Sequence, residues 1–256
     1  MAKERLGSLE LNRIYQMDCL EGMKLIPDKS IDMILCDLPY GQTSNSWDSI
    51  IPLDELWEQY NRIIKDNGAV VLMAKGKFKI NLINSNFSNY RYEWVWDKNK
   101  GANFAHVKRM PLNVHEYAVI FYKKQPTYNP QMTEGKPYTQ KRLKESVKGI
   151  ADSMRRHTTK SDGKRYPKSI IRVEGMAQRH IVHPTQKPVS LFSYLIKTYT
   201  NEGDIVLDNC MGSGTTAIAS TLNNRRWLGF ETEADYVELA NKRLGQINLE
   251  YDLKDY

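Results

Sequence analysis

The feature that most constrains this chain is a predicted strand, glycine turn, helix and second strand in direct succession near its C-terminal end. Residues 204–207, with three consecutive apolar residues after Asp204, predict a buried strand, and Gly212-Ser213-Gly214 predicts a tight turn. Apolar spacing predicts a helix over 215–222 and a strand over 226–230 that ends at Glu231. In a Rossmann-like site such a turn lets the backbone approach a nucleotide, and the acid binds ribose hydroxyls. Tight packing explains a lone Gly-x-Gly equally well, but Glu231 favours the nucleotide interpretation.

The same turn excludes two other kinds of nucleotide site. It lacks the Gly-Lys-Ser/Thr sequence with which a P-loop holds the β and γ phosphates. A dinucleotide fingerprint would have a third glycine where Ala217 stands, and nothing downstream supplies a second nucleotide half. The expected ligand is therefore a nucleoside rather than a dinucleotide.

The rest of the chain predicts strands and helices in alternation, the pattern of a mostly parallel sheet. Asp66-Asn67-Gly68 is interpreted as a stop between a helix and a strand, and Pro188 as the residue that opens a later helix. We expect strands over 13–17, 31–36, 69–74, 92–96 and 117–122, and helices over 53–64, 189–199 and 234–244. The fold class is therefore α/β.

Apolar runs and cysteine usage narrow the class of protein. The longest apolar runs, 31–36 and 68–74, are far shorter than the roughly 20 residues of a membrane span. The first ten residues mix charges without an apolar core, which does not fit a secretory signal. Cys19, Cys36 and Cys210 leave an odd count without a Cys-x-x-Cys pair, so we expect neither a disulfide framework nor a metal site. We expect a cytoplasmic protein that has no membrane partner.

Positive charge is concentrated in one quarter of the chain. Residues 123–187 hold sixteen Lys and Arg against five Asp and Glu, and the remaining residues carry a net charge of −4 within a total of +7. A polyanion is the natural partner of such a segment, because each cation that neutralises a phosphate releases a counterion. A solvated loop explains the same surplus without any partner. Few apolar residues recur periodically in this segment, so we expect irregular backbone there.

The tetrapeptide Asp37-Leu38-Pro39-Tyr40 directly follows the predicted strand over 31–36. This position places it at the carboxyl end of the sheet, where open α/β folds bind their ligands. A rigid turn at the end of a strand explains the proline without any chemistry. The position nevertheless makes Asp37 and Tyr40 candidate functional residues.

Together these motifs resemble the β class of DNA amino-methyltransferases, which use S-adenosylmethionine (SAM). Asp37 to Tyr40 is similar to the family motif Asp-Pro-Pro-Tyr, and Asp208 to Thr215 is similar to Asp-Pro-Phe-x-Gly-Ser-Gly-Thr. His183 to Pro188 is similar to the segment that precedes the SAM strand. The order, with the catalytic motif first and the SAM motif last, is that of this circularly permuted class. The resemblance extends over about residues 11–244 and implies a Rossmann-like methyltransferase fold with a mixed seven-stranded sheet.

The resemblance implies a role for each matching residue. Tyr40 would stack on a flipped base, and Pro39 would stiffen the turn. Asp37 would accept a hydrogen bond from the target amine before direct in-line transfer. Lys187 either meets the SAM carboxylate or simply precedes a helix. The implied cofactor-binding residues are Asp18, Thr185, Lys187, Asp208, Met211, Gly212, Ser213, Gly214, Thr215 and Glu231. Pairing of strand 13–17 with strand 226–230 would bring three of these acids into one pocket.

At two places the sequence differs from the family motifs, which limits how far the family's residue roles apply to this chain. Leu38 replaces the first proline, which should loosen the turn but leave Asp37 and Tyr40 in place. Asn209-Cys210 replaces Pro-Phe and removes an aromatic ring that would pack against SAM, so a lower cofactor affinity is expected.

Candidate DNA contacts fall into two groups. Trp96 and Lys98 resemble, with Trp94, His115 and Glu116, a family segment beside the target-base pocket. Core packing explains at least one of the two tryptophans, and a structural role is favoured for the histidine. The basic segment contributes phosphate contacts or base readers: Arg155, Arg156, Lys164, Arg165, Lys168 and Arg172.

These observations predict one catalytic domain, residues 1–256, with a target-recognition insertion over 125–182. The expected activity is site-specific methylation of adenine N6 in double-stranded DNA, because the family pattern pairs Asp at position 37 with adenine. Cytosine N4, an RNA substrate and a DNA-binding module without transfer activity stay open as alternatives. Homodimers are common in the family, and the sequence leaves a restriction endonuclease partner undecided.

Overall fold

The chain forms two compact units. The computed structural model describes residues 4–41, 49–141, 158–173 and 186–250. The larger unit comprises Met1–Asn129 and Ser169–Tyr256, and the smaller unit comprises Pro130–Lys168. Within the described ranges, no helix is both long enough and apolar enough to cross a membrane.

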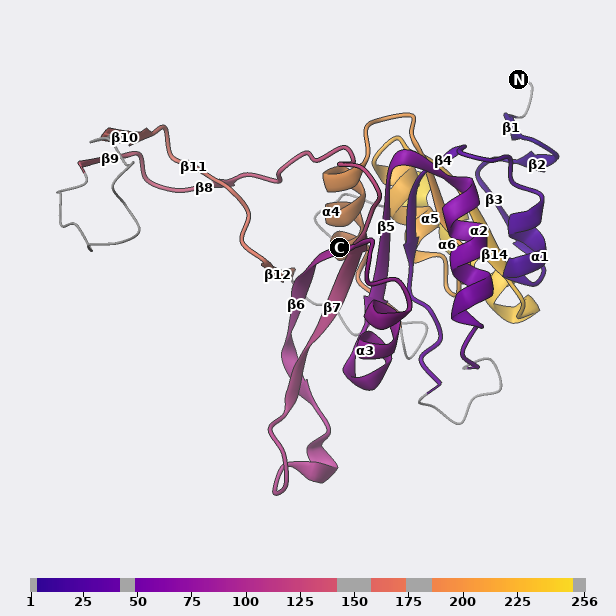
Figure 1. Cartoon of the computed structure of the whole chain (residues 1–256), viewed down its shortest axis with the longest axis horizontal. Helices are drawn as coiled ribbons and strands as arrows, with labels where there is room; N and C mark the ends of the chain where they lie inside the picture. Colours follow the sequence, from indigo (N-terminus) through magenta and orange to yellow (C-terminus); the bar gives the residue numbers. More distant parts are fainter. Residues whose placement is uncertain (1–3, 42–48, 142–157, 174–185, 251–256) are drawn as a thin grey trace. The chain divides into compact units, whose positions relative to one another are not determined.

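The larger unit is built on an eight-stranded sheet (Figure 1). Its strands in spatial order are β12 (Ile170–Arg172), β6 (Tyr90–Ala102), β7 (Asn113–Phe121), β5 (Ile64–Ala74), β4 (Ile31–Cys36), β13 (Ile205–Asp208), β14 (Arg226–Glu231) and β3 (Arg13–Gln16). β7 is antiparallel to both of its neighbours, and all other neighbours in this sheet are parallel. The prediction of a mixed, mostly parallel α/β fold is confirmed. The predicted number of seven strands is wrong by one, because β12 at the end of the basic segment adds to β6.

The predicted pairing of the first sheet strand with the last is present. β14 pairs with β3 in parallel, with Ile14 opposite Gly229 and Gln16 opposite Glu231. The residues that follow β3 therefore lie at the same edge of the sheet as those that follow β13 and β14.

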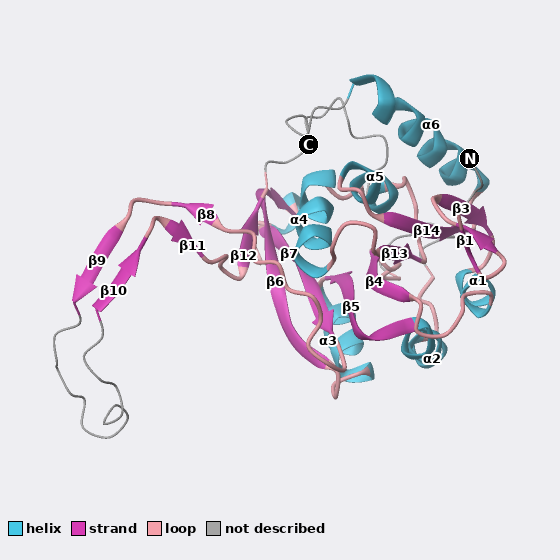
Figure 2. Ribbon diagram, turned by 90° about the horizontal axis from the view of Figure 1, so that it is seen from above, coloured by secondary structure: helices cyan, strands magenta, loops and turns pink. Residues whose placement is uncertain are grey.

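Helices cover both faces of the sheet (Figure 2). One face packs against α1 (Cys19–Lys24), α2 (Leu53–Ile63) and α3 (Gly76–Ser85), and the other packs against α4 (Val189–Tyr199), α5 (Thr215–Leu222) and α6 (Ala234–Glu250). β4 shows the alternation: Ile34 and Cys36 join the first core cluster, whereas Met33 and Leu35 join the second. Burial on both faces explains why the central strands are continuous apolar runs.

The predicted stop between a helix and a strand at residues 66–68 is wrong. Asp66-Asn67-Gly68 does not end an element, because β5 starts at Ile64, directly after α2. Ile31 pairs with Ile64 and Met33 with Ala69, so a register shift against β4 accommodates the intervening residues within the strand.

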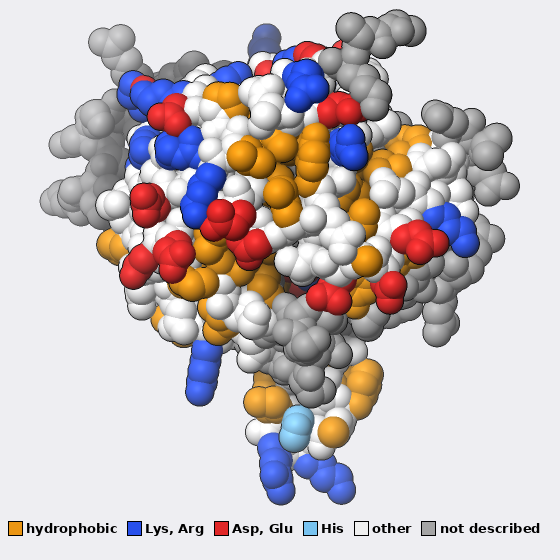
Figure 3. All heavy atoms as spheres, turned by 90° about the vertical axis from the view of Figure 1, so that its right-hand side faces the viewer, with side chains coloured by type: hydrophobic (Ala, Val, Ile, Leu, Met, Phe, Trp, Pro, Cys, Tyr) orange, Lys and Arg blue, Asp and Glu red, His pale blue; other side chains and the backbone are white. Residues whose placement is uncertain are grey.

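β6 and β7 are also longer than predicted and form a hairpin that projects beyond the sheet (Figure 1). A short helical turn, η1 (Phe104–His106), lies at its tip, and the Phe104 side chain there is 68% exposed. Hydrophobic and basic side chains share this tip at the bottom of Figure 3. The sequence signal is weak because the projecting part has no buried face and hence no apolar alternation.

The smaller unit contains short strand pairs where irregular backbone was expected. β8 (Thr133–Glu134) pairs with β11 (Lys164–Arg165), and β9 (Tyr138–Lys141) pairs with β10 (Thr158–Ser161), both antiparallel. These strands are polar and mostly exposed, so they lack the apolar periodicity that predicts a strand. A separate short pair in the larger unit joins β1 (Arg5–Leu6) to β2 (Leu9–Glu10).

Candidate active site

A cavity of about 530 Å³ lies at the edge of the sheet where the parallel strands end. Asp18, Asp37, Lys75, Asp208 and Glu231 line it, and each lies at or just beyond the end of β3, β4, β5, β13 or β14. Because parallel strands present their carboxyl ends at one edge, residues far apart in sequence meet there. The strand pairing thus builds a single site from both halves of the chain.

The turn between β13 and α5 is held by Asp208. This buried carboxylate accepts hydrogen bonds from the Cys210 amide at 3.0 Å and from Thr216 Oγ1 at 2.5 Å. Burial raises the pKa of Asp208 to about 6, despite these donors, which act to lower it. Gly212 and Gly214 have φ angles of +50° and +83°, which favour glycine. The sequence-predicted tight turn is therefore present.

Glu231 ties the same turn to β14. Its carboxylate accepts from the Gly212 amide at 2.7 Å, from Thr232 at 2.9 Å and from Glu233 at 3.0 Å. A carboxylate has about four acceptor positions, so Glu231 retains capacity for a ligand hydroxyl. Asp18 caps α1 by accepting from the Leu20 and Glu21 amides at 2.8 and 3.1 Å. Both acids line the cavity while holding local structure.

The Asp37–Tyr40 tetrapeptide forms another part of the wall. Tyr40 Oη donates to Asp37 Oδ1 at 2.7 Å, and the Tyr40 ring stacks on Phe78 with centroids 4.9 Å apart. Burial, followed by the charge of Asp37, raises the pKa of Tyr40, so the phenol stays protonated as a donor. Leu38 is buried in the core at 4% exposure, and Asp37, Pro39 and Tyr40 all line the cavity.

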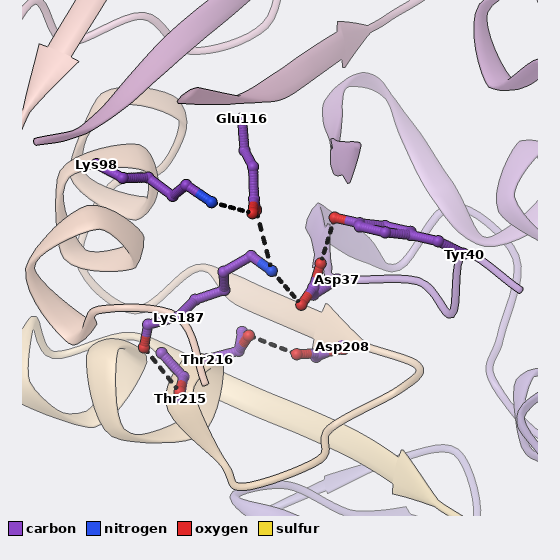
Figure 4. A network of polar contacts seen from close by, with 8 residues as sticks. All are labelled: Asp37, Tyr40, Lys98, Glu116, Lys187, Asp208, Thr215 and Thr216. Carbon is purple, nitrogen blue, oxygen red and sulfur yellow. Dashed lines mark hydrogen bonds and ion pairs between the residues drawn. The ribbon is translucent and has the colours of Figure 1, made fainter. Parts of the chain in front are cut away.

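A chain of polar contacts runs along the cavity from Lys98 to Tyr40 (Figure 4). Lys187 Nζ lies 2.6 Å from Asp37 Oδ2 and 3.3 Å from Glu116 Oε2, and Lys98 Nζ lies 2.9 Å from Glu116 Oε1. Burial alone would lower the pKa of Lys187, but Asp37 and Glu116 raise it; burial would raise the pKa of Glu116, but Lys187 and Lys98 lower it. Lys187 and Glu116 are therefore both charged near neutral pH.

Sequence reasoning missed several residues of this wall. Lys75 directly follows β5, as Asp37 follows β4, so the strand-end rule could have identified it. Glu116 was grouped with a candidate segment but given no role, because nothing in its local sequence indicates its partner Lys187. The other lining residues without a predicted role are Met17, Cys19, Leu38, Ser49, Ile51, Gln186, Phe192, Asn209, Cys210, Thr232 and Tyr236.

Asn209, which stands where the family motif has proline, has a buried partner. Tyr60 Oη donates to Asn209 Oδ1 at 2.5 Å, and Asn209 Nδ2 donates to Cys210 Sγ at 3.4 Å. Tyr60 is fully buried, so its hydroxyl requires such an acceptor. Asn209 in place of proline therefore supplies a hydrogen-bond acceptor for the buried Tyr60 hydroxyl and does not disrupt the turn.

The remaining predicted site residues divide into three groups. Met211, Gly212, Ser213 and Thr215 line the cavity with Trp96 and Lys98, whereas Gly214 packs against Ala240 behind it. Trp94 donates to Tyr199 Oη in the core, and His115 Nε2 lies 2.9 Å from Tyr117 Oη. Thr185, Arg155 and Arg156 lie outside the described residues.

The other predicted DNA contacts lie outside this cavity. Arg172 is exposed on β12 and pairs with Asp97 at 3.1 Å. Lys164, Arg165 and Lys168 belong to the smaller unit. The Arg165 guanidinium lies 4.7 Å from the centre of the Tyr138 ring, and its Nη2 donates to the Lys136 carbonyl at 2.5 Å. Arg165 therefore supports the smaller unit, whereas Lys164 and Lys168 are exposed.

Comparison with known proteins adds a consistent set of similarities. The DNA methylase family model N6_N4_Mtase matches residues 31–242. The DNA adenine methyltransferase YhdJ of Escherichia coli K12 is 26% identical, over 94% of this chain and 84% of its own length. The solved M1.HpyAVI–SAM complex has a TM-score of 0.64 at 24% identity, over 91% of this chain and 98% of that one. The PvuII cytosine-N4-specific DNA methyltransferase has a TM-score of 0.66 at 16% identity, over 90% and 85%.

Proposed function

The chain belongs to the N6/N4 DNA methylase family, and from this premise we propose that it transfers a methyl group from SAM to adenine N6 at specific sites in double-stranded DNA. One observation carries the proposal. Asp37 and Tyr40 line the same cavity as the Gly212 turn and Glu231, although they come from opposite halves of the chain. A methyl acceptor and a nucleoside donor need such a shared cavity.

The residues present fit a nucleoside-containing cofactor. The cavity volume of about 530 Å³ lies within the usual range for small-molecule sites. We propose that Glu231 accepts from ribose hydroxyls, that Asp18 accepts from the adenine, and that the 211–215 turn holds the cofactor through its backbone. When bound, SAM supplies an electrophilic methyl group on a sulfonium centre. Asp208 already accepts hydrogen bonds from within the turn. Its contribution is therefore to hold the turn in place rather than to bind the cofactor by itself.

Asp37 and Tyr40 would handle the target base. An exocyclic amine is a weak nucleophile, because its lone pair is delocalised into the ring, and in a duplex it is also paired and stacked. Tyr40, fixed against Phe78, offers a ring on which a flipped base can stack. Asp37 accepts a hydrogen bond from the amine and stabilises its developing positive charge. No covalent intermediate with the protein is required, and the amine loses its proton to Asp37 or water after transfer.

The choice between adenine and cytosine rests on position 37. Within the family pattern Asp accompanies adenine, and the similarity to a DNA adenine methyltransferase supports the same assignment. The fold is shared with a cytosine-N4 enzyme, so cytosine N4 is the second candidate.

Cations are available for the phosphates of a duplex. Lys108 and Arg109 are exposed at the tip of the β6–β7 hairpin, which rises from the same edge of the sheet as the cavity. Residues 125–182 would form the target-recognition region, with most of the surplus positive charge. We also propose that two copies of this chain form a homodimer in solution.

Methyl transfer from labelled SAM tests this function. We expect the wild-type chain to label double-stranded DNA, and digestion to nucleosides to yield N6-methyldeoxyadenosine. Asp37→Ala should lower the rate at least about a hundredfold, because it removes the only proposed acceptor for the amine. Asp54→Ala, a change to an exposed acid on α2, should retain wild-type activity. Labelled N4-methyldeoxycytidine in the digest would show that the target base is cytosine rather than adenine. DNA binding without any incorporated label would reject the proposed transfer activity.

A further inference from the structure

One buried acid in the cavity has no part in the transfer described above. Glu116 lies on β7, and its side chain is only 8% exposed. A buried carboxylate is destabilising unless cations or donors compensate it. Two lysines do so from different elements, since Lys98 approaches Oε1 from β6 and Lys187 approaches Oε2 from the residues before α4 (Figure 4). The acid is therefore placed to act on both cations.

Lys187 is shared between two carboxylates. Its side chain is 9% exposed, and its Nζ lies 2.6 Å from Asp37 and 3.3 Å from Glu116. The other oxygen of Asp37 already accepts from Tyr40 Oη. Asp37 thus has one donor on each oxygen, and a target amine has to use a remaining lone pair. How strongly Lys187 binds Asp37 decides how available that lone pair is.

The charges of the cluster balance only when Glu116 is present. Asp37 and Glu116 offset Lys98 and Lys187, so the four groups sum to zero. Without Glu116, the buried Lys187 would have Asp37 as its single anionic partner and would bind it more tightly. The cluster would also carry a net positive charge where the target amine becomes positive, which opposes transfer.

We propose that Glu116 is a positioning residue: its carboxylate attracts the Lys187 ammonium and so weakens the binding of Lys187 to Asp37. Asp37 is then able to accept a hydrogen bond from the target amine. This inference rests on the proposed function, because it assigns that role to Asp37. Tyr40 faces Lys187 from beyond β4, with its ring centre 5.8 Å from Nζ. Lys75, beyond β5, lines the same cavity and adds a further positive charge that acts on Glu116.

Steady-state kinetics of Glu116→Gln on the full chain tests the proposal. The amide has the shape of the acid without its charge, so we expect kcat to fall about ten- to a hundredfold, as for a misplaced reacting group. The KM values for SAM and for DNA should stay within about twofold, because Glu116 acts on the bound complex. An unchanged kcat, or a loss confined to KM, would overturn the proposal.

A double-mutant cycle with Lys187→Met separates positioning from general support of the fold. If Glu116 acts through Lys187, then Glu116→Gln should have no further effect on kcat in the Lys187→Met background. Losses that multiply would show that Glu116 acts independently of Lys187, which contradicts the proposal. Glu116→Asp keeps the charge at a shorter reach and should recover part of kcat; it replaces Glu116→Gln if that variant does not fold.

Two controls keep the outcomes distinct. Glu93 pairs with Lys79 at 3.0 Å outside the cavity, so Glu93→Gln should leave kcat unchanged. Thermal unfolding and calorimetric SAM binding check each variant for folding. Full activity in Asp37→Ala, or no transfer by the wild-type chain, would defeat the proposed function. Loss of activity in Asp37→Ala with normal kcat in Glu116→Gln would defeat this inference alone.

Discussion

At the residue scale, Asp208 shows how a site residue is held at an energetic cost. Its carboxylate is 3% exposed and accepts from two neutral donors, Thr216 Oγ1 and the Cys210 amide. Burial raises its pKa from 3.8 to about 6, so the folded state binds a proton more readily than the unfolded chain does. The charged form therefore destabilises the fold near neutral pH, and that penalty is relieved as the pH falls through about 6.

Replacing Asp208 by Asn should change how stability depends on pH. Between pH 7 and pH 5 the wild type gains about 1 kcal/mol relative to Asp208→Asn, because only the acid takes up a proton on folding. Urea unfolding of both proteins at the two pH values measures this difference. A constant difference between them would show that Asp208 stays ionised throughout the range.

Residues at the ends of predicted strands were identifiable from sequence. Asp37, Asp208 and Glu231 each lie at such an end, and all three line the cavity. There is a physical reason why the sequence did not assign a role to Glu116. It lies within an antiparallel strand, and its importance depends on Lys187, whose approach is set by three-dimensional packing rather than by spacing in the chain. Long-range ion pairs of this kind carry no periodic signal.

At the element scale, the junction of β13 with α5 depends on how closely α6 packs. A Cβ atom at Gly214 would lie 2.8 Å from Ala240 Cβ, and the φ angle of +83° already favours glycine. Gly203 has a similar φ angle of +80°, but a Cβ there would meet nothing within 4 Å. The two glycines therefore separate backbone strain from steric contact.

We expect Gly214→Ala to destabilise the fold more than Gly203→Ala. The matched change at Gly203 should cost about 1 kcal/mol for the left-handed backbone. Gly214→Ala should cost about 2–4 kcal/mol, because overpacking against α6 adds to that strain. Chemical denaturation measures both, and calorimetry should show weaker SAM binding only for Gly214→Ala. Equal losses of stability would mean that α6 yields to the added methyl group.

Element boundaries were predictable where burial imposes a pattern. The helix over 215–222 is found at its predicted bounds, since both its packing and its turn are encoded locally. β5 begins earlier than predicted because pairing with β4 overrides the turn signal of Asp66-Asn67-Gly68. The β6–β7 hairpin and the strands of the smaller unit lack a buried face, so their sequences do not alternate.

At the scale of the whole molecule, charge and catalysis are encoded in different parts of the chain. The described residues that line the cavity belong to the larger unit and lie outside residues 125–182, which carry most of the surplus positive charge. Within the smaller unit, Arg165 is engaged in internal contacts, while Lys160, Lys164 and Lys168 are exposed. Among the described residues of the smaller unit, these three exposed lysines are placed to meet phosphates without supporting the fold.

Replacing these three lysines by Ala should weaken DNA binding in a salt-dependent manner. Each lost phosphate contact lowers the slope of log K against log salt by about 0.9, so the triple variant should bind with a slope smaller by up to about 3. SAM affinity should stay unchanged, because the cofactor residues lie elsewhere. Lys197→Ala, a change to an exposed lysine on α4, serves as the control and should leave the slope as in the wild type. An unaltered slope in the triple variant would move the phosphate contacts to other cations, of which Lys108 and Arg109 on the β6–β7 hairpin are the next to test.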